Sequence, residues 1–478
     1  MNSDLKKLTE DFLKFEIEEK LFDDCLFNIK YWDYIRQEVY YELISQKALP
    51  PLVWPQKAVL RKKSQIINKY LNEFFSLPFF IIGLIINRIK NIQNNKVDII
   101  IFEDNNKRVI NGRKVNYHTY KIARDLSQKF NVLLVDTSKI NEPVYSVYPF
   151  KVINIRLIHL GYRLKTKFLK LSPLKKLFLL NLKNRIQQRF NFTFNFMDII
   201  SNHFLFQKGL MKWAIKLLNK YKPKLVLFTD GGSMHYASEA ANKFGISSAE
   251  IQHGSVTQYS LIRNYKNIDA TLLTTKPDII FTFGKFWHDR YGNNISKRVL
   301  GCPFHDKVLF QTEKKNKISK KSILAVSTLD HQLVKFMIGF AKKCSDFEIF
   351  YKLRSEEYRT WESLYPYDIN SVKNFHMVDN DEINIINRIL NADYIISSDS
   401  TAIYEALHLK KKCIIFKGVL WEMQESLIDE NVVPLVKNVE ELEQIVNSKW
   451  DYKLVKSEIY AKYDSGILCE NINEIISK

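Results

Sequence analysis

Short runs of β-branched and other apolar residues alternate with helical patterns through most of this chain, and this alternation limits the possible fold more than any other feature. The run VDIIIFED at 97–104 has the composition of a buried parallel strand that opens into a polar loop. A helical pattern at 118–130 and an apolar run at 131–138 follow it. Together the three segments predict a β-α-β unit, which is the building block of a parallel sheet.

The same rhythm resumes after residue 222 and continues through the second half of the chain. Further strands are predicted at 224–229, 247–252, 277–284, 321–328, 347–353, 393–400 and 412–418. Helices are predicted between them at 233–245, 330–344 and 401–411. We therefore expect an α/β protein with two Rossmann-like domains that face each other across a cleft.

A chain of 478 residues is too long for one ordinary core, which agrees with a division into domains. The stretch around 301–320 is polar and Lys-rich, as a linker would be. The predicted regions are a helical N-terminal region at 1–96, a first Rossmann-like domain at 97–305 with a basic helical insertion at 151–220, a second Rossmann-like domain at 306–450, and a C-terminal helix at 451–478. The sequence leaves open whether that last helix packs back on the first domain.

The composition limits the partners and the cellular compartment that are expected for the protein. The formal net charge of +20 favours an anionic partner. The five cysteines lie far apart without a C-x-x-C pair, which predicts reduced thiols in the cytoplasm and no structural zinc site. The first residues are charged and mixed, unlike a signal peptide. The most apolar run, at 74–86, is shorter than the ~20 residues that span a bilayer, and is either a buried or an interfacial helix.

Residues 151–190 stand apart because they carry eleven Lys or Arg and no Asp or Glu, interleaved with Leu, Ile and Phe. Two interpretations stay open. The segment is either a solvated helical face in a Lys-rich protein or an amphipathic surface that rests on anionic lipid. Nucleic acid is not expected as a partner, since no known nucleic-acid-binding motif accompanies the charge.

Two groups of candidate site residues follow strands of the predicted first sheet, at the edge where ligands of open parallel sheets bind. Asp230 ends one strand, and Gly231 and Gly232 after it let the backbone approach a ligand closely. His253 follows the next strand, and an imidazole titrates near neutrality, which suits removal of a proton from a hydroxyl. The alternatives are an ordinary Asp-Gly turn and a structural histidine.

A third group lies in the second predicted sheet. The turn SSDST combines helix-capping side chains with backbone N–H groups that could hold a phosphate oxygen, although an ordinary capped helix is the alternative. Glu405 lies one turn into the helix, where its carboxylate could accept hydrogen bonds from the ribose or sugar hydroxyls of a ligand. Lys352 and Arg354 end another strand, and strand alternation would place both on one face as a diphosphate clamp.

In this order, the motifs DGG, QHG, GCPFHDK, YKLR and SSDSTAIYEAL resemble those of bacterial GT-B glycosyltransferases of surface polysaccharide assembly. That group includes capsule and lipopolysaccharide sugar transferases and the CDP-glycerol polymerases of teichoic acid synthesis. The resemblance spans roughly residues 97–475 by the order of the motifs, not by close identity. One departure is Arg354, which stands where relatives carry a histidine that assists the leaving phosphate.

The resemblance implies a role for each matching position. His253 matches the proposed base, with Asp230 as its orienting partner. The crossover between domains matches Gly301, Pro303 and Asp306. The donor site matches Ser398, Asp399, Ser400, Thr401 and Glu405, with Lys352 and Arg354 beside it. The acceptor side of the cleft takes Arg108, Asn111 and Arg113 from the loop at 105–120, together with Gly231, Gly232, Gln252 and Gly254.

The function predicted on these grounds is transfer of a sugar from a nucleotide-activated donor to a growing polysaccharide or a lipid-linked acceptor, with inversion. The nucleotide sugar is a substrate, no cofactor is expected, and no metal is expected because no D-x-D motif is recognised beside the donor residues. The segment 151–190 would hold the enzyme against the anionic inner face of the cytoplasmic membrane. The alternatives are a non-catalytic scaffold of polysaccharide assembly and a glycerophosphate-type transferase.

Overall fold

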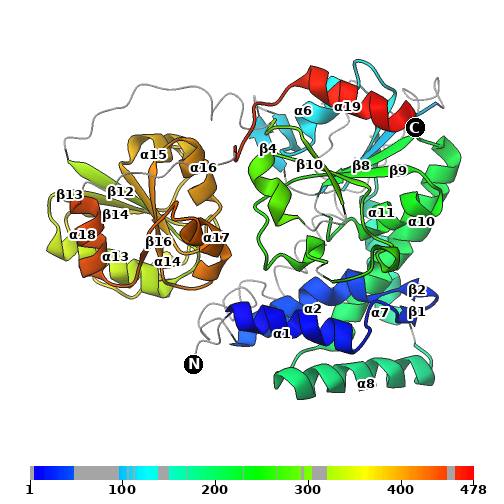
Figure 1. Ribbon diagram of the computed structural model, residues 1–478, viewed down its shortest axis with the longest axis horizontal. Coiled ribbons are helices and arrows are strands. Elements are labelled where there is room, and N and C mark those ends of the chain that lie inside the picture. The colour runs from blue at the N-terminus through cyan, green and yellow to red at the C-terminus, as the bar shows by residue number, and fades with distance from the viewer. Residues whose placement is uncertain are drawn as a thin grey trace.

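Two parallel sheets, each covered by helices, form two Rossmann-like domains in the computed structural model (Figure 1). The structure describes residues 5–47, 96–104, 107–110, 113–137, 150–169, 171–229, 231–265, 267–291, 295–303, 320–448 and 458–477. The fold class expected from the sequence, a GT-B-type pair of Rossmann-like domains with a helical N-terminal extension, is confirmed by this topology.

The first sheet has seven strands in the order β11-β10-β9-β8-β3-β6-β7, and all neighbours are parallel. Along the chain these are β3 (Ile99–Phe102), β6 (Val132–Asp136), β7 (Lys151–Asn154), β8 (Leu225–Thr229), β9 (Ser247–Ile251), β10 (Ile279–Thr282) and β11 (Ser296–Val299). Strands β3, β6 and β8 are buried at every position, because helices cover both faces of the sheet.

The second sheet has six parallel strands in the order β14-β13-β12-β15-β16-β17. These are β12 (Lys321–Val326), β13 (Phe347–Lys352), β14 (Phe375–Val378), β15 (Tyr394–Ser397), β16 (Lys412–Phe416) and β17 (Leu435–Val436). In both sheets the chain steps outward from a central strand in two directions. The carboxyl ends of the central strands therefore open onto one edge, where the candidate residues lie.

Helices of both domains follow the strands as expected. In the first domain they are α6 (Tyr120–Leu126), α7 (Arg156–Phe168), α8 (Pro173–Phe190), α9 (Phe196–Ile199), a π-helix (Ile200–Leu205), α10 (Phe206–Tyr221) and α11 (His235–Lys243). In the second they are α13 (His331–Lys343), α14 (Trp361–Leu364), α15 (Ile385–Asn391), α16 (Ala402–His408), α17 (Glu425–Asp429) and α18 (Val439–Asn447).

The basic segment 151–190 is not helical throughout, and in this respect the prediction was wrong. Its first residues form β7, the edge strand of the first sheet, with alternating half-buried and buried positions. Helices α7 and α8 follow. An edge strand with one partner needs only one buried face, so its sequence lacks the continuous apolar run that marks a central strand.

The helical N-terminal extension packs on the first domain. It consists of α1 (Leu5–Glu18), a short hairpin of β1 (Cys25–Leu26) and β2 (Ile29–Lys30), and α2 (Trp32–Lys47). Their apolar residues join the core that also contains one side of the first sheet. The apolar run at 74–86 and the rest of 48–95 lie outside the described residues.

The C-terminal segment returns from the second domain to the first. Helix α19 (Ser465–Ser477) lies across the first domain (Figure 1), and its Leu468 and Ile472 pack in the core beside Ile99 of β3. The chain before it is fixed by backbone contacts, since Ala461 N donates to Phe283 O at 2.7 Å. The returning segment thus ties together the chain on both sides of the predicted crossover.

Gly301, one of the predicted crossover residues, has a φ of +83°, and a Cβ added there would lie 2.7 Å from the backbone of Lys462. We expect Gly301→Ala to lower the free energy of unfolding by more than the ~1–2 kcal/mol that left-handed backbone alone costs, because the clash adds to it. Gly245→Ala is the matched control, with a φ of +62° and no atom within 4 Å. Equal losses for the two variants in urea denaturation would contradict this account of the crossover.

Candidate functional site

A polar cluster occupies the carboxyl end of β3 in the first domain. The side chain of Asn116 donates to Asp104 Oδ1 at 2.6 Å and accepts from the backbone N–H groups of His118 and Thr119 at 2.9 and 3.0 Å. The hydroxyl of Thr119 donates to buried Glu103. These bonds fix the turn and hold Nδ1 of buried His118 at 3.4 Å from Asp104 Oδ2.

His253 faces this cluster from the end of β9. Its backbone turn is fixed by the buried amide of Gln252, which accepts from Phe283 N at 2.8 Å and donates to Gly254 O at 2.8 Å. The His253 side chain is exposed, and its ring lies edge-on to the ring of His118 with 6.0 Å between centroids. Two imidazoles therefore meet at the mouth of the first sheet, and the predicted base does not point into packed core.

His118 and Asp104 were not singled out from the sequence. Both flank or lie within the loop at 105–120, which the family resemblance had marked as an acceptor-side loop. A signal was present, because the acidic pair Glu103 and Asp104 follows an apolar strand directly and a histidine begins the predicted helix at 118–130. What brings them together is the side chain of Asn116, whose bonding cannot be read from spacing.

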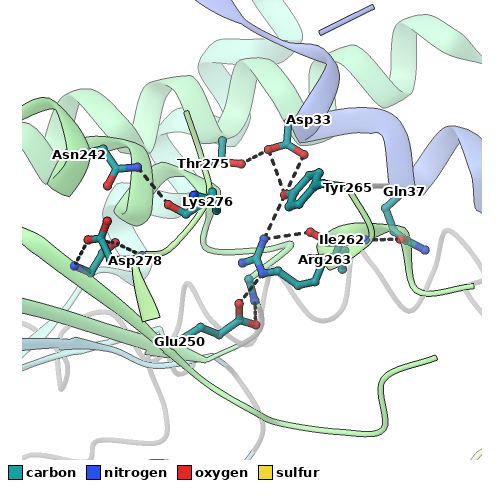
Figure 2. Close-up of polar contacts among 12 residues, drawn as sticks. Asp33, Gln37, Asn242, Glu250, Ile262, Arg263, Tyr265, Thr275, Lys276 and Asp278 are labelled. Carbon is teal, nitrogen blue, oxygen red and sulfur yellow. Dashed lines mark hydrogen bonds and ion pairs between the residues drawn. The ribbon is translucent and has the colours of Figure 1, made fainter. Parts of the chain in front are cut away.

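The glycines after β8 serve a buried ion pair. Gly231 N donates to Glu250 Oε1 at 3.1 Å, and the other oxygen of Glu250 accepts from Arg263 Nε at 2.5 Å (Figure 2). A side chain at Gly231 would overlap the guanidinium of Arg263. Gly232 accepts from the side chain of Gln207 at 2.9 Å. The group that approaches the backbone closely, and therefore requires glycine at position 231, is the guanidinium of Arg263 of the protein itself.

Figure 2 shows how this ion pair continues into the N-terminal extension. Arg263 donates to the hydroxyl of Tyr265, and that hydroxyl donates to Asp33 of α2 at 3.2 Å. Thr275 also donates to Asp33, and Gln37 accepts from Ile262 N at 3.0 Å. Helix α2 therefore holds the segment that follows His253.

The predicted donor turn begins at the carboxyl end of β15. Ser398 donates to Asp330 Oδ2 at 3.0 Å, and the same oxygen accepts from Val419 N at 2.9 Å. Asp330 is fully buried and also caps α13 by accepting from Gln332 N. The Asp330 carboxylate therefore joins three loops of the second domain at this edge, and Ser398 belongs to one of them.

The rest of the turn is more open. Thr401 is exposed and Ser400 half-buried, with the Ser400 hydroxyl accepting weakly from Ala402 N at 3.3 Å. Helix α16 begins at Ala402 and is seven residues long, and Glu405 in its first turn is half-buried. Asp399 is half-buried beside them. Thr401 is therefore the exposed residue of the predicted donor turn, and Asp399, Ser400 and Glu405 are half-buried around it.

The two predicted basic residues of the donor site are arranged differently from expectation. Strand β13 ends at Lys352, so the alternation that would place Arg354 on the same face stops before it. Lys352 is buried, lies 3.0 Å from Asp381 Oδ1 and contacts the hydroxyl of Tyr358, whereas Arg354 is exposed. The pair does not form one clamp, because Lys352 is already neutralised.

Asp381 belongs to a D-x-D triplet, Asp379-Asn380-Asp381, which follows β14 and which the sequence-based expectation overlooked. No group of three or more His, Cys, Asp or Glu side chains suited to a metal ion occurs within the described ranges. Metal independence stays a prediction.

Aromatic residues lie beside both candidate sites. The ring of Tyr117 contacts His118 in the first domain, with 5.4 Å between centroids. Burial, followed by the charges of Glu405, Cys302 and Tyr117, raises the pKa of Tyr460 well above its usual range. The ring of Tyr460 in turn packs on His408 of α16 at 5.5 Å. The ring of Tyr460 also packs on Phe283 of the first domain, with 5.7 Å between centroids, so this residue of the returning C-terminal segment contacts both domains.

The segment after His253 also contacts the second domain directly. The carboxylate of Glu425 in α17 accepts from Tyr259 OH at 2.7 Å and from Gln258 Nε2 at 2.6 Å, and Lys6 of α1 lies 3.3 Å away. Arg290 lies within 3.2 Å of Glu430. The two domains meet next to the candidate site through side chains from both the extension and the His253 segment.

The remaining predicted site residues are placed as follows. Asp230, Asn111 and Asp306 lie outside the described residues. Arg108 and Arg113 lie in a two-stranded antiparallel hairpin of β4 (Lys107–Ile110) and β5 (Arg113–Asn116). Pro303 is buried after Gly301 at the predicted crossover.

No protein-family model and no curated protein sequence matches the chain. Solved structures of similar fold include the UDP-GlcNAc 2-epimerase of Methanocaldococcus jannaschii, with a TM-score of 0.48, 13% identity, and coverage of 79% of this chain and 99% of that one. The UDP-GlcNAc 2-epimerase of Neisseria meningitidis gives 0.46 and 13% over 79% and 99%. MurG of Acinetobacter baumannii gives 0.45 and 12% over 80% and 100%. At these values the function has to be argued from the residues of this chain.

The bond between Ser398 and Asp330 is testable by a double-mutant cycle. Because both partners are buried and one is a carboxylate, we expect Ser398→Ala and Asp330→Ala to couple by about 1.5 kcal/mol in urea denaturation. Ser400→Ala serves as control, since its hydroxyl has no bond to Asp330 among the described contacts, and should combine additively with Asp330→Ala. Additive effects of Ser398→Ala and Asp330→Ala would show that the hydroxyl is free for a ligand.

Proposed function

We propose that the protein is a glycosyltransferase that moves a sugar from a nucleotide-activated donor to a hydroxyl of an acceptor, with inversion. The observation that carries the proposal is the pairing of His253 with His118 at the edge of the first sheet, together with the open turn at the start of α16 in the second domain. A titratable group on one sheet edge and a polar helix start on the other are what such a transfer needs.

The first domain would activate the acceptor. The acceptor oxygen bonds to the anomeric carbon of the sugar, the bond from that carbon to the terminal phosphate oxygen breaks with its electron pair left on the phosphate, and the hydroxyl proton passes to His253. The His118 ring limits the orientation of His253, and Asp104 limits that of His118. Asp104 thus offers a second supporting carboxylate, and the role predicted for Asp230 stays a prediction.

The second domain would hold the donor. Ser400 and Thr401 offer hydroxyl and backbone donors at the open part of the turn, and Glu405 offers a carboxylate to sugar or ribose hydroxyls. Arg354 is an exposed cation on this edge, and it would stabilise the charge that develops on the leaving phosphate. Lys352 would act through Asp381 and Tyr358 and not directly on the phosphate.

The acceptor proposed is a growing bacterial surface polysaccharide or a lipid-linked precursor, with the enzyme on the inner face of the cytoplasmic membrane. The support for this is the motif order, which is similar to that of capsule and lipopolysaccharide transferases and of the CDP-glycerol group. The basic segment 151–190 supports the membrane location, because it carries no acidic residue.

A non-catalytic scaffold is the second candidate, and the neutralised Lys352 favours it. A donor site that lacks both the family histidine and a free lysine has lost two of its cations. Calorimetric titration with UDP-, CDP-, GDP- and CMP-sugars separates the two proposals, because a scaffold would bind none of them.

The base is tested by His253→Ala. We expect turnover of the bound nucleotide sugar to fall by roughly 10²–10⁴-fold with the donor Kd unchanged, since loss of general-base catalysis affects the chemical step. His376→Ala is the matched control, because His376 lies on β14 and pairs with Glu348 at 2.7 Å away from this edge. Near-normal turnover by His253→Ala, or an equal loss in His376→Ala, would contradict the proposed role.

A further inference from the structure

Helix α8 forms the outermost layer of the first domain (Figure 1) and is apolar on two opposite sides. The inner side packs in the core through Leu179, Leu182, Ile186 and Phe190. The outer side carries Leu174, Leu177 and Leu180, which are 79%, 56% and 46% exposed. Because these three leucines follow one another at intervals of three residues, they lie along one side of the helix. Within the described part of the chain, no other element covers this outward row of leucines.

A cluster of lysines lies at the same end of α8 as these leucines. The ammonium groups of Lys175 in α8 and Lys208 in α10 lie 3.7 and 3.4 Å from the ring centroid of Phe27, at the tip of the β1–β2 hairpin. Phe27 has a φ of +57°, a conformation rare for a bulky side chain, so the hairpin tip is held in a strained shape that presents the ring. Three elements distant in sequence thus converge on one basic site.

The cluster is not neutralised by the protein. Burial, and then the charges of Lys212 and Lys175, lower the pKa of Lys208 to about 8. Within the described ranges, none of these three ammonium groups has a carboxylate at ion-pair distance. At the other end of α8, by contrast, Arg185 and Arg189 pair with acidic residues of α1 and its C-terminal turn. The end of α8 that carries the exposed leucines is therefore also the end that lacks these ion pairs.

We propose that α8 lies flat in the interface of an anionic bilayer, with Leu174, Leu177 and Leu180 among the upper acyl chains and the lysines around Phe27 on lipid phosphates. Interfacial helices combine such an apolar side with flanking lysines. An 18-residue helix of about 27 Å runs along the surface, and no described helix is long and apolar enough to cross a bilayer.

Charge complementarity selects the bilayer over a protein partner, because phosphates arrayed at a surface can satisfy several convergent ammonium groups at once. The inference deepens the membrane location given in the proposed function. It rests on the proposed function only for the way in which the cleft is oriented relative to the membrane. Its test uses no donor or acceptor. Loss of sugar transfer would therefore leave it standing, and loss of membrane binding would leave the transferase proposal standing.

The test is flotation of the full-length protein with vesicles of phosphatidylcholine alone or mixed with phosphatidylglycerol. We expect binding only to the anionic vesicles. Leu177→Asp should weaken binding to anionic vesicles roughly tenfold or more, because the apolar area that the leucine buries in the bilayer is lost. Lys208→Gln should weaken that binding about fivefold, because one contact with lipid phosphate is lost. Ile467→Asp on α19 is the control of like exposure for Leu177→Asp. Lys412→Gln on β16 is the control for Lys208→Gln, because Lys412 is also half-buried and lies over an aromatic ring, that of Tyr394. Both controls should bind as the wild type does.

Unchanged melting temperatures would show that the exposed substitutions leave the fold intact. Inorganic phosphate at matched ionic strength should not displace the protein from vesicles. The proposal is overturned if the wild type binds no vesicle, if it binds neutral and anionic vesicles equally, or if the control variants lose binding as much as Leu177→Asp. It is equally overturned if inorganic phosphate abolishes binding, because the lysines would then form a site for a free anion.

Discussion

The buried guanidinium of Arg36 is the interaction on which the arrangement of the candidate site depends. It donates to both oxygens of buried Glu16, at 2.8 and 2.5 Å, and to the backbone oxygens of Leu261 and Asn264 at 2.8 and 3.0 Å. Burial raises the pKa of Glu16, and the adjacent arginine opposes that shift. A buried ion pair of this kind is costly to break on one side, by about 3–5 kcal/mol. It fixes the path of the chain that follows His253.

That path connects the extension, the base and the second domain. From His253 the chain runs to Tyr259, which bonds Glu425 of α17, then to Arg263, which pairs with Glu250 beneath the turn after β8. Asp33 anchors the same segment from α2. The helical extension thus helps to position both the imidazole and the contact between the domains. The proposed chemistry needs that coupling, since neither sheet edge alone holds a base and a donor turn.

Much of the fold could be predicted from the sequence because parallel strands that are buried on both faces have continuous apolar sequences. Ile99 to Phe102 and the run ending at Thr229 show this clearly. Edge strands cannot be recognised in this way, because they lack such continuous apolar runs. β7 lies in a lysine-rich segment and β14 has two half-buried residues, so neither has the composition of a central strand. Short edge strands need a neighbour to be recognised, and the neighbour is supplied only by the fold.

The candidate site was predictable to the extent that it follows strand ends. His253 was found in this way, and the turn at 397–401 as well. Contacts between residues far apart in the chain were not visible. Lys352 is neutralised by Asp381, and His118 is set by the side chain of Asn116. Spacing predicts which residues reach an edge, but their charge state and orientation depend on partners that come from other loops.

The most direct test of this account is amide hydrogen exchange in the double variant Arg36→Met/Glu16→Gln, which removes the ion pair without leaving a lone buried charge. The account predicts faster exchange in the segment 253–265 and unchanged exchange in β3 and β8. Unchanged exchange in 253–265, or equally faster exchange throughout the first sheet, would contradict the claim that the N-terminal extension holds the site segment in place.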